Sequence, residues 1–239
     1  MKTFGLIGHP LQHSFSKDYF EKKFINENIE DVQYLNVESE KVETLFENRL
    51  LSEFSGFNVT IPFKESIIAF LDEIDSSAQE INAVNCVKRE NNKLIGYNTD
   101  FIAFKETLIP FLTKNHKKAL VLGSGGASKA IIYALKKLTI DYTVVSRKSD
   151  FNYQSIDKNT IADHQIIINC TPLGTYPNSN TFPPLPYEYL TENHLLYDLV
   201  YNPAESAFLK KGKQYNCQTK NGLEMLKIQA EKSYLIWSK

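Results

Sequence analysis

The sequence has few cysteines, little excess charge of either sign and no long apolar run, and each of these absences excludes a class of protein. The three cysteines are odd in number and widely spaced, which argues against a disulfide framework or a zinc site. A net charge of −1 gives no global reason to expect binding to nucleic acid or to an anionic membrane. No apolar stretch approaches the roughly 18 residues that a membrane-spanning helix needs.

The N-terminal segment and the histidines add two further exclusions. The apolar part of the first ten residues is too short for a signal-peptide core, and no small-residue cleavage site follows it. We therefore expect a cytoplasmic protein that associates with neither membrane nor nucleic acid. The five histidines form no pair within an expected helix, so we expect no metal. With 239 residues, 42% of them apolar, the chain can form one large or two modest globular domains.

Short β-rich runs alternate with amphipathic helical stretches along the chain. This alternation predicts an α/β fold with parallel sheets covered by helices. Helices are expected at residues 17–28, 42–51, 100–112, 127–138 and 223–237, and another is expected to begin at Pro62, where the fixed φ of proline is favourable. Residues 171–186 hold five of the nine prolines and are expected to form a loop. We predict an N-terminal α/β domain of about 100 residues, followed by a nucleotide-binding domain.

A glycine-rich turn follows the strand expected at residues 119–122 and opens the next helix. Gly123 permits a tight turn, and Gly125 lets the backbone approach a pyrophosphate. Ser128 replaces the third glycine of the usual dinucleotide fingerprint, so the match is partial, and a purely structural turn is the alternative. The expected cofactor-binding residues of the turn are Gly123, Ser124, Gly125, Gly126 and Ala127.

The next strand ends in Ser146, Arg147 and Lys148, where an NAD-binding unit usually has an acidic residue. An acidic side chain would repel the 2′-phosphate of NADP, whereas arginine can bind a phosphate with two hydrogen bonds. The segment therefore predicts NADP rather than NAD as the cofactor. A solvated pair of surface cations is the alternative.

Four earlier segments, residues 8–16, 56–64, 81–87 and 96–100, carry more polar side chains than folding requires. Ser14 and Ser16 precede an expected helix and can receive a carboxylate, although Ser16 could instead cap the helix. Lys64 and Asp100 are the one pair in these segments suited to proton transfer beside a hydride acceptor. Hydride delivery to a ketone places negative charge on its oxygen, which a nearby ammonium group stabilises and can protonate.

Together with residues 168–174, 198–203 and 221–230, these motifs resemble the shikimate dehydrogenase family over nearly the whole chain. The resemblance implies a two-domain α/β fold with an active-site cleft between the domains. Residues 1–101 and 223–239 would form the substrate domain, with a mainly parallel sheet, and residues 102–222 a Rossmann-like NADP-binding domain. It also implies the reversible, NADPH-dependent reduction of 3-dehydroshikimate to shikimate, a step in aromatic amino-acid biosynthesis, by a monomer or homodimer.

The family resemblance assigns roles to individual residues. Lys64 and Asp100 would be the catalytic pair. The substrate would be bound by Ser14, Ser16, Thr60, Lys64, Asn85, Asp100, Tyr201 and Gln229. The cofactor would be bound by the glycine turn, the segment at Ser146 to Lys148, and by Thr171, Gly222 and Met225.

Three positions depart from the family pattern, namely Lys17, Asn82 and Ala103, and none of them removes a proposed catalytic group. Two alternatives to the implied function stay open at this point. One is a quinate or broader-specificity dehydrogenase of the same family. The other is a module that binds NADP and shikimate without turnover, which the intact Lys64 and Asp100 disfavour.

Overall fold

The computed structural model describes residues 1–11, 14–147 and 150–239, which pack into two compact units. Unit 1 comprises Met1–Thr99 and Gln229–Lys239, and unit 2 comprises Asp100–Ile228. The chain enters unit 2 at the first residue of α4 (Asp100–Leu108) and returns to unit 1 within α8 (Leu223–Ser238). The domain boundaries expected from the sequence lie after residues 101 and 222, whereas the two units change over after Thr99 and after Ile228.

Within the described residues, unit 1 is built on six strands in the order β2-β1-β3-β5-β6-β4. The strand β1 is parallel to β2 and β3, β4 is parallel to β6, and β5 is antiparallel to both β3 and β6. The elements of unit 1 are β1 (Lys2–Gly8), α1 (Phe15–Asn26), β2 (Val32–Glu38), α2 (Val42–Glu47), β3 (Phe54–Val59), the 3₁₀ helix η1 (Ser66–Phe70), β4 (Glu73–Ile74), α3 (Ser76–Ile81), β5 (Cys86–Glu90), β6 (Lys93–Tyr97) and the end of α8.

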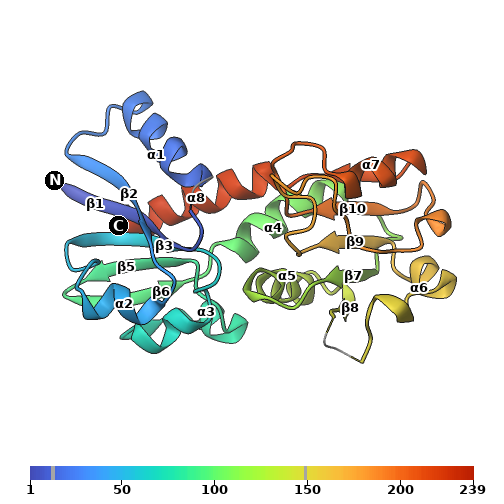
Figure 1. Cartoon of the computed structure of the whole chain (residues 1–239), viewed down its shortest axis with the longest axis horizontal. Helices are drawn as coiled ribbons and strands as arrows, with labels where there is room; N and C mark the ends of the chain where they lie inside the picture. The colour runs from blue at the N-terminus through green and yellow to red at the C-terminus, as the bar shows by residue number, and fades with distance from the viewer. Residues whose placement is uncertain (12–13, 148–149) are drawn as a thin grey trace. The chain divides into compact units, whose positions relative to one another are not determined.

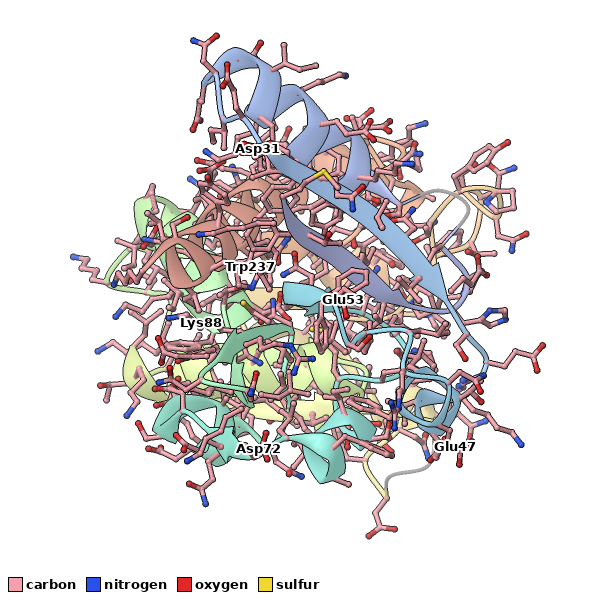
Figure 2. The ribbon with its side chains drawn as sticks, turned by 90° about the vertical axis from the view of Figure 1, so that its left-hand side faces the viewer. Asp31, Glu47, Glu53, Asp72, Lys88 and Trp237 are labelled. Atoms are coloured by element: carbon pink, nitrogen blue, oxygen red, sulfur yellow. The ribbon has the colours of Figure 1, made fainter. Side chains whose placement is uncertain are left out.

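Side chains on the two faces of this sheet form two separate cores. One core joins β1 and β2 to α1 and to the end of α8, and the other joins β1 and β3 to α2, η1 and α3 (Figure 1). Trp237 of α8 stacks on Phe4 at 4.8 Å and donates from Nε1 to the carbonyl of Val87 at 2.9 Å. Only glycine fits opposite it, since a Cβ on Gly56 would lie 2.4 Å from the indole. Figure 2 shows Trp237 inside unit 1 and the exposed Asp31 at its periphery.

Unit 2 contains a sheet whose five described strands are all parallel, in the order β11-β10-β9-β7-β8. Its faces are covered by α4, α5 and the start of α8 on one side and by α7 and α6 on the other. The strand order reverses between β7 and β9, and such a reversal is where open α/β sheets bind ligands. The elements are β7 (Lys118–Leu122), α5 (Gly126–Lys137), β8 (Asp141–Val145), α6 (Lys158–Asp163), β9 (Ile166–Asn169), β10 (Leu195–Asp198), α7 (Ala207–Gln214), β11 (Gln218–Lys220) and the 3₁₀ helices η2 (Ile109–Phe111), η3 (Tyr153–Ser155) and η4 (Tyr187–Tyr189).

The helix that the sequence predicts from Pro62 is not found there. Residues 61–65 form turns, and a short 3₁₀ helix begins only at Ser66. The backbone N–H of Phe63 donates to the carbonyl of Thr60, and that of Ile67 donates to the carbonyl of Phe63. The segment therefore forms isolated turns and no continuous helix. Across the described parts of the chain, no helix combines the length and the apolar character needed to cross a membrane.

Candidate active site

Several of the polar segments meet at one edge of the unit 1 sheet. Because β1 and β3 are parallel, their carboxyl ends lie together, and the N–H of Thr60 donates to the carbonyl of Ile7 at 2.9 Å. The antiparallel β5 starts at the same edge, where the N–H of Val59 donates to the carbonyl of Asn85 at 2.9 Å. The segments that carry Ser14, Thr60, Lys64 and Asn85 therefore all leave or enter the sheet at this edge.

The two serines of the first polar segment differ in their surroundings. Ser14 stands at the N-cap position of α1, but its hydroxyl makes no capping bond. That hydroxyl is buried and has no hydrogen-bond partner in the described part of the chain. Ser16 lies within α1, is buried, and is hydrogen-bonded to the phenol of Tyr34. Helix capping by Ser16 is therefore wrong, and Ser14 has a hydroxyl with spare hydrogen-bonding capacity.

Asn85, Thr99 and Gln229 form a buried cluster of polar side chains beside this edge. The Oδ1 atom of Asn85 accepts a hydrogen bond from the backbone N–H of Thr99 at 2.7 Å. The Nδ2 atom of Asn85 donates to Oγ1 of Thr99 at 2.9 Å and to Oε1 of Gln229 at 3.3 Å. The structure thus brings together two of the residues expected to bind substrate, through a threonine that sequence reasoning did not single out.

Lys64 and Asp100, the expected catalytic pair, lie in different elements. Lys64 is half-buried in the turns after β3, and its carbonyl accepts from the N–H of Val84 at 2.7 Å. Asp100 is buried at the first position of α4 and directly follows Thr99. Their joint action in proton transfer stays a prediction.

The glycine turn of unit 2 has the geometry that a phosphate cradle requires. Gly123 has a φ of +110°, and a Cβ there would lie 3.2 Å from Cγ2 of Thr171. The turn after β7 therefore packs against the segment after β9, at the reversal of strand order. Gly125 has open space around it, and α5 begins at the next residue with Ser128 donating from Oγ to the carbonyl of Gly125 at 2.7 Å. Ser124 and Gly125 are exposed, while Gly126 and Ala127 are half-buried.

The remaining cofactor residues expected from the sequence lie along unit 2. Ser146 is half-buried and Arg147 is exposed at the end of β8, whereas Lys148 lies outside the described residues. Thr171 is held by Asn169, whose Oδ1 accepts from its N–H at 3.0 Å and from its hydroxyl at 2.6 Å. The other two are the buried Gly222, where a Cβ would lie 2.2 Å from the carbonyl oxygen of Leu199, and the core residue Met225. Tyr201, which is expected to bind the substrate, is half-buried in the same unit.

Asn169, which holds Thr171, also contacts a buried carboxylate to which sequence reasoning assigned no role. Asp198 ends β10 with no exposed surface and accepts hydrogen bonds from Nδ2 of Asn169 at 2.9 Å, from the N–H of Val200 at 3.0 Å and from the hydroxyl of Ser206. Burial raises the pKa of Asp198 to about 6, although its three hydrogen bonds act in the opposite direction. Asn169 and Asp198 are the polar last residues of two apolar strands, and that pattern could have identified them.

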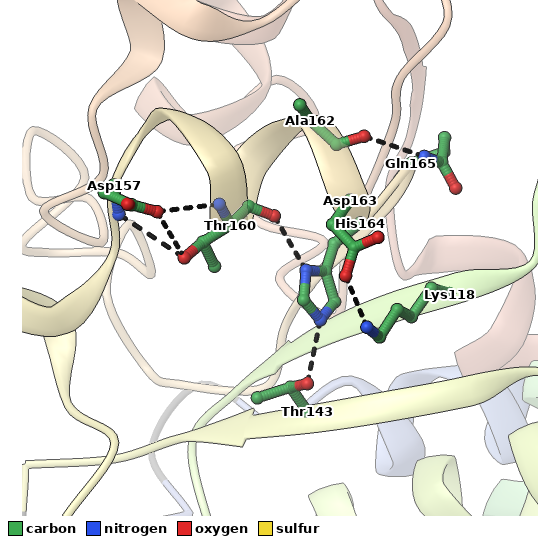
Figure 3. Close-up of polar contacts among 8 residues, drawn as sticks. All are labelled: Lys118, Thr143, Asp157, Thr160, Ala162, Asp163, His164 and Gln165. Carbon is green, nitrogen blue, oxygen red and sulfur yellow. Dashed lines mark hydrogen bonds and ion pairs between the residues drawn. The ribbon is translucent and has the colours of Figure 1, made fainter.

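Another polar cluster of unit 2, shown in Figure 3, has a structural explanation. His164 follows α6, and its Nδ1 lies 2.7 Å from the carbonyl oxygen of Thr160 while its Nε2 lies 2.8 Å from Oγ1 of Thr143. Burial lowers the pKa of His164. The ring thus ties α6 to β8, and the neighbouring ion pair between Lys118 and Asp163 ties α6 to β7.

Comparisons with known proteins identify the family. The sequence pattern of the shikimate dehydrogenase substrate binding domain matches residues 6–87. A shikimate dehydrogenase (NADP(+)) of Methanococcus maripaludis is 38% identical to the chain over an alignment that covers 99% of this chain and 92% of the relative. The chain belongs to the shikimate dehydrogenase family.

Solved structures of the family share the fold over the whole chain. The shikimate 5-dehydrogenase of Thermus thermophilus, crystallised with NADP(H) and shikimate, has a TM-score of 0.88 and 29% identity, covering 100% of this chain and 94% of that one. A shikimate dehydrogenase crystallised with NADP+ has a TM-score of 0.86 and 34% identity, covering 100% and 90% of the two chains. The family and the two-domain α/β fold class predicted from the sequence are thereby confirmed.

Proposed function

We propose that the chain is an NADP-dependent shikimate dehydrogenase, which reduces the ketone of 3-dehydroshikimate to shikimate and catalyses the reverse oxidation. Family membership and the shikimate and NADP(H) bound to the Thermus thermophilus relative support this activity. The observation that carries the proposal is the convergence of the segments with Ser14, Thr60, Lys64 and Asn85 at one sheet edge.

In this proposal the substrate is bound through its carboxylate and its hydroxyls. Ser14 and Ser16 bind the carboxylate, for which the hydroxyl of Ser14 has spare capacity. The residues that bind the ring and its hydroxyls are Thr60, Asn85, Tyr201 and Gln229. Neutral hydroxyl and amide groups suit this task, because they hydrogen-bond a polar ring without adding charge to the site.

The proton chemistry is assigned to Lys64 and Asp100. The ammonium of Lys64 stabilises the negative charge that develops on the ketone oxygen and donates a proton to it, and the carboxylate of Asp100 orients Lys64 and accepts from a substrate hydroxyl. NADPH, when bound, supplies the hydride.

The residues of unit 2 fit a phosphorylated dinucleotide. The positive φ of Gly123, the open space at Gly125 and the start of α5 provide backbone N–H groups that an anion can approach. The 2′-phosphate of NADP is assigned to Ser146, Arg147 and Lys148. The remaining assigned cofactor residues are Ser124, Gly126, Ala127, Thr171, Gly222 and Met225. The cleft between the domains, the monomeric or homodimeric state and the cytoplasmic location stay predictions of the sequence.

Cofactor absorbance tests the proposed activity directly. With NADP, we expect the chain to oxidise shikimate faster than quinate. We also expect shikimate with NADP to react faster than either acid with NAD. Absence of turnover with all four pairs of acid and cofactor contradicts the proposal. Rates with quinate, or with NAD, that equal the rate with shikimate and NADP favour the broader-specificity alternative.

The role of Lys64 has its own test. Lys64→Ala is expected to lower kcat for shikimate by about 100-fold or more, the size of a general acid–base contribution. Lys93→Ala is a matched control, because Lys93 is an exposed lysine of the same unit paired with Glu73 at 2.6 Å, and we expect it to keep the normal rate. Near-normal turnover in Lys64→Ala contradicts the assigned role.

A further inference from the structure

Thr99 connects the two residues whose amide side chains are proposed to bind the substrate. It is fully buried, and its backbone N–H donates to Oδ1 of Asn85 at 2.7 Å. Its hydroxyl accepts from Nδ2 of Asn85 at 2.9 Å and donates to the backbone carbonyl of Gln229 at 3.1 Å. One residue thus links the amide that precedes β5 to the C-terminal helix.

These contacts determine which end of each amide points where. The oxygen and nitrogen ends of an amide have nearly the same shape, so only their hydrogen-bond partners select the orientation. The backbone N–H of Thr99 can only donate, and it therefore selects Oδ1 of Asn85 and turns Nδ2 toward Gln229. Because Nδ2 of Asn85 donates to Oε1 of Gln229 at 3.3 Å, Nε2 of Gln229 is the group turned away from Asn85.

A further layer of buried groups holds Thr99 and Gln229 in place. The hydroxyl of Ser233 donates to the carbonyl of Gln229 at 2.9 Å and lies 3.3 Å from the hydroxyl of Thr99. Ser233 in turn accepts from Nδ2 of Asn58 at 2.8 Å, and Oδ1 of Asn58 accepts from the phenol of Tyr34 at 3.0 Å. A buried network in which each group has a partner restricts the rotation of its members.

We infer that Thr99 is a positioning residue for the substrate, because its backbone N–H selects the orientation of the Asn85 amide and its hydroxyl holds that amide and the backbone of Gln229 in place. The inference deepens the proposed function and rests on it, since both amides are assigned to the substrate there. A threonine that only fills the core would contribute to stability and leave substrate affinity unchanged, so the two roles differ in a measurable quantity.

Thr99→Val tests the inference, because valine keeps the size and branching of threonine and removes only the hydroxyl. The backbone bond to Asn85 remains, but Nδ2 of Asn85 loses one partner. We expect KM for shikimate to rise about 3- to 10-fold, the effect of one ordinary hydrogen bond, while the dissociation constant of NADP stays unchanged. Thr99→Ser keeps the hydroxyl and is expected to restore the normal KM. Initial rates and calorimetric titration with shikimate and with NADP measure these quantities.

Thr107→Val provides a matched control in unit 2. Thr107 is also buried, and its hydroxyl donates to the carbonyl of Ala103 at 2.8 Å and lies 2.7 Å from the phenol of Tyr197. The same chemical change there is expected to lower Tm and leave KM for shikimate unchanged. If Thr99→Val also lowers Tm without changing KM or the calorimetric affinity, Thr99 only packs and the inference is overturned.

A double-mutant cycle tests whether Thr99 acts through Asn85. We expect Thr99→Val and Asn85→Ala together to raise KM by less than the product of their separate effects, because the second change removes the group that the first misplaces. Fully multiplicative effects contradict the inference. Failure of the unaltered protein to bind or oxidise shikimate would instead reject the proposed function, which distinguishes the two failures.

Discussion

At the scale of single residues, Ser14 holds a buried hydroxyl that the described protein leaves without a partner. Such a group costs stability, because it loses water on folding and gains no hydrogen bond in return. Its neighbour Ser16 has the opposite character, with a bond to the phenol of Tyr34. The two serines should therefore respond differently to substitution, although sequence reasoning assigns them the same role.

Ser14→Ala is expected to weaken substrate binding without weakening the fold. Removing an unpaired hydroxyl should leave the free energy of unfolding unchanged or raise it by up to about 1 kcal/mol. Loss of a hydrogen bond to a carboxylate should raise KM for shikimate by roughly 10-fold or more. Denaturant unfolding and initial rates measure the two effects.

Ser16→Ala is the matched comparison for this prediction. It removes a bond between two buried groups, so we expect the free energy of unfolding to fall by about 1 kcal/mol. If Ser14→Ala also loses that much stability and keeps its KM, the hydroxyl of Ser14 serves the fold and the prediction is wrong.

At the scale of elements, the turn from β7 into α5 contains two glycines, and a different physical requirement applies at each position. Gly123 needs glycine for its own conformation, with a φ of +110° and Thr171 close to the Cβ position. Gly125 has an ordinary extended backbone, with φ −84° and ψ −178°, and no atom within 4 Å of its Cβ position. The fold therefore requires Gly123, whereas only a ligand would require Gly125.

Gly125→Ala is expected to change cofactor affinity and leave stability within about 0.5 kcal/mol of the unaltered protein. A methyl group would occupy the space through which a pyrophosphate approaches the helix start, and we expect the dissociation constant of NADPH to rise about tenfold or more. Fluorescence titration with NADPH and thermal unfolding measure the two effects.

Gly123→Ala should show a different result, with about 1 to 3 kcal/mol of stability lost to backbone strain. Unchanged NADPH affinity in Gly125→Ala would exclude the proposed cradle.

The sequence predicts the elements that have a clear apolar period and misses those that depend on tertiary contacts. The helix expected at residues 127–138 is found at Gly126–Lys137. The short α3 has little period of its own and is defined by its ends, where Asp75 caps the N–H of Ser77 at 3.0 Å and Asn82 has a φ of 55°. Local pattern cannot predict an element whose stability comes from its caps and neighbours.

The C-terminal helix shows why the site was only partly predictable. Apolar spacing predicts a buried stripe through Leu223, Leu226, Ala230, Tyr234 and Trp237, yet the first two and Tyr234 are only half-buried. The buried residues of the helix include Gln229 and Ser233, which face the polar groups of Thr99 and Asn58. Periodicity assigns polar residues to the exposed face, so it identifies candidate ligands but not the buried network that holds them.

At the scale of the whole molecule, Asp198 makes the stability of the fold depend on pH. Its pKa is about 6 in the folded protein, mainly because of burial, and close to 4 in an unfolded chain. Between these values the folded protein binds the proton and the unfolded chain does not. The contribution of Asp198 is therefore complete below about pH 4 and is lost as the pH rises through about 6. A shift of about two units corresponds to roughly 3 kcal/mol.

Asp198→Asn should remove this dependence, because an amide does not titrate and its oxygen can still accept from Val200 and Asn169. We expect the difference in unfolding free energy, variant minus unaltered protein, to increase by about 3 kcal/mol in favour of the variant between pH 4 and pH 7. Urea unfolding at several pH values measures this difference.

Asp163→Asn is a control of opposite sign, since the ion pair with Lys118 lowers the pKa of that exposed carboxylate and favours the unaltered protein as the pH rises. A difference for Asp198→Asn that stays constant from pH 4 to pH 7 would mean that the buried carboxylate does not exchange its proton in this range.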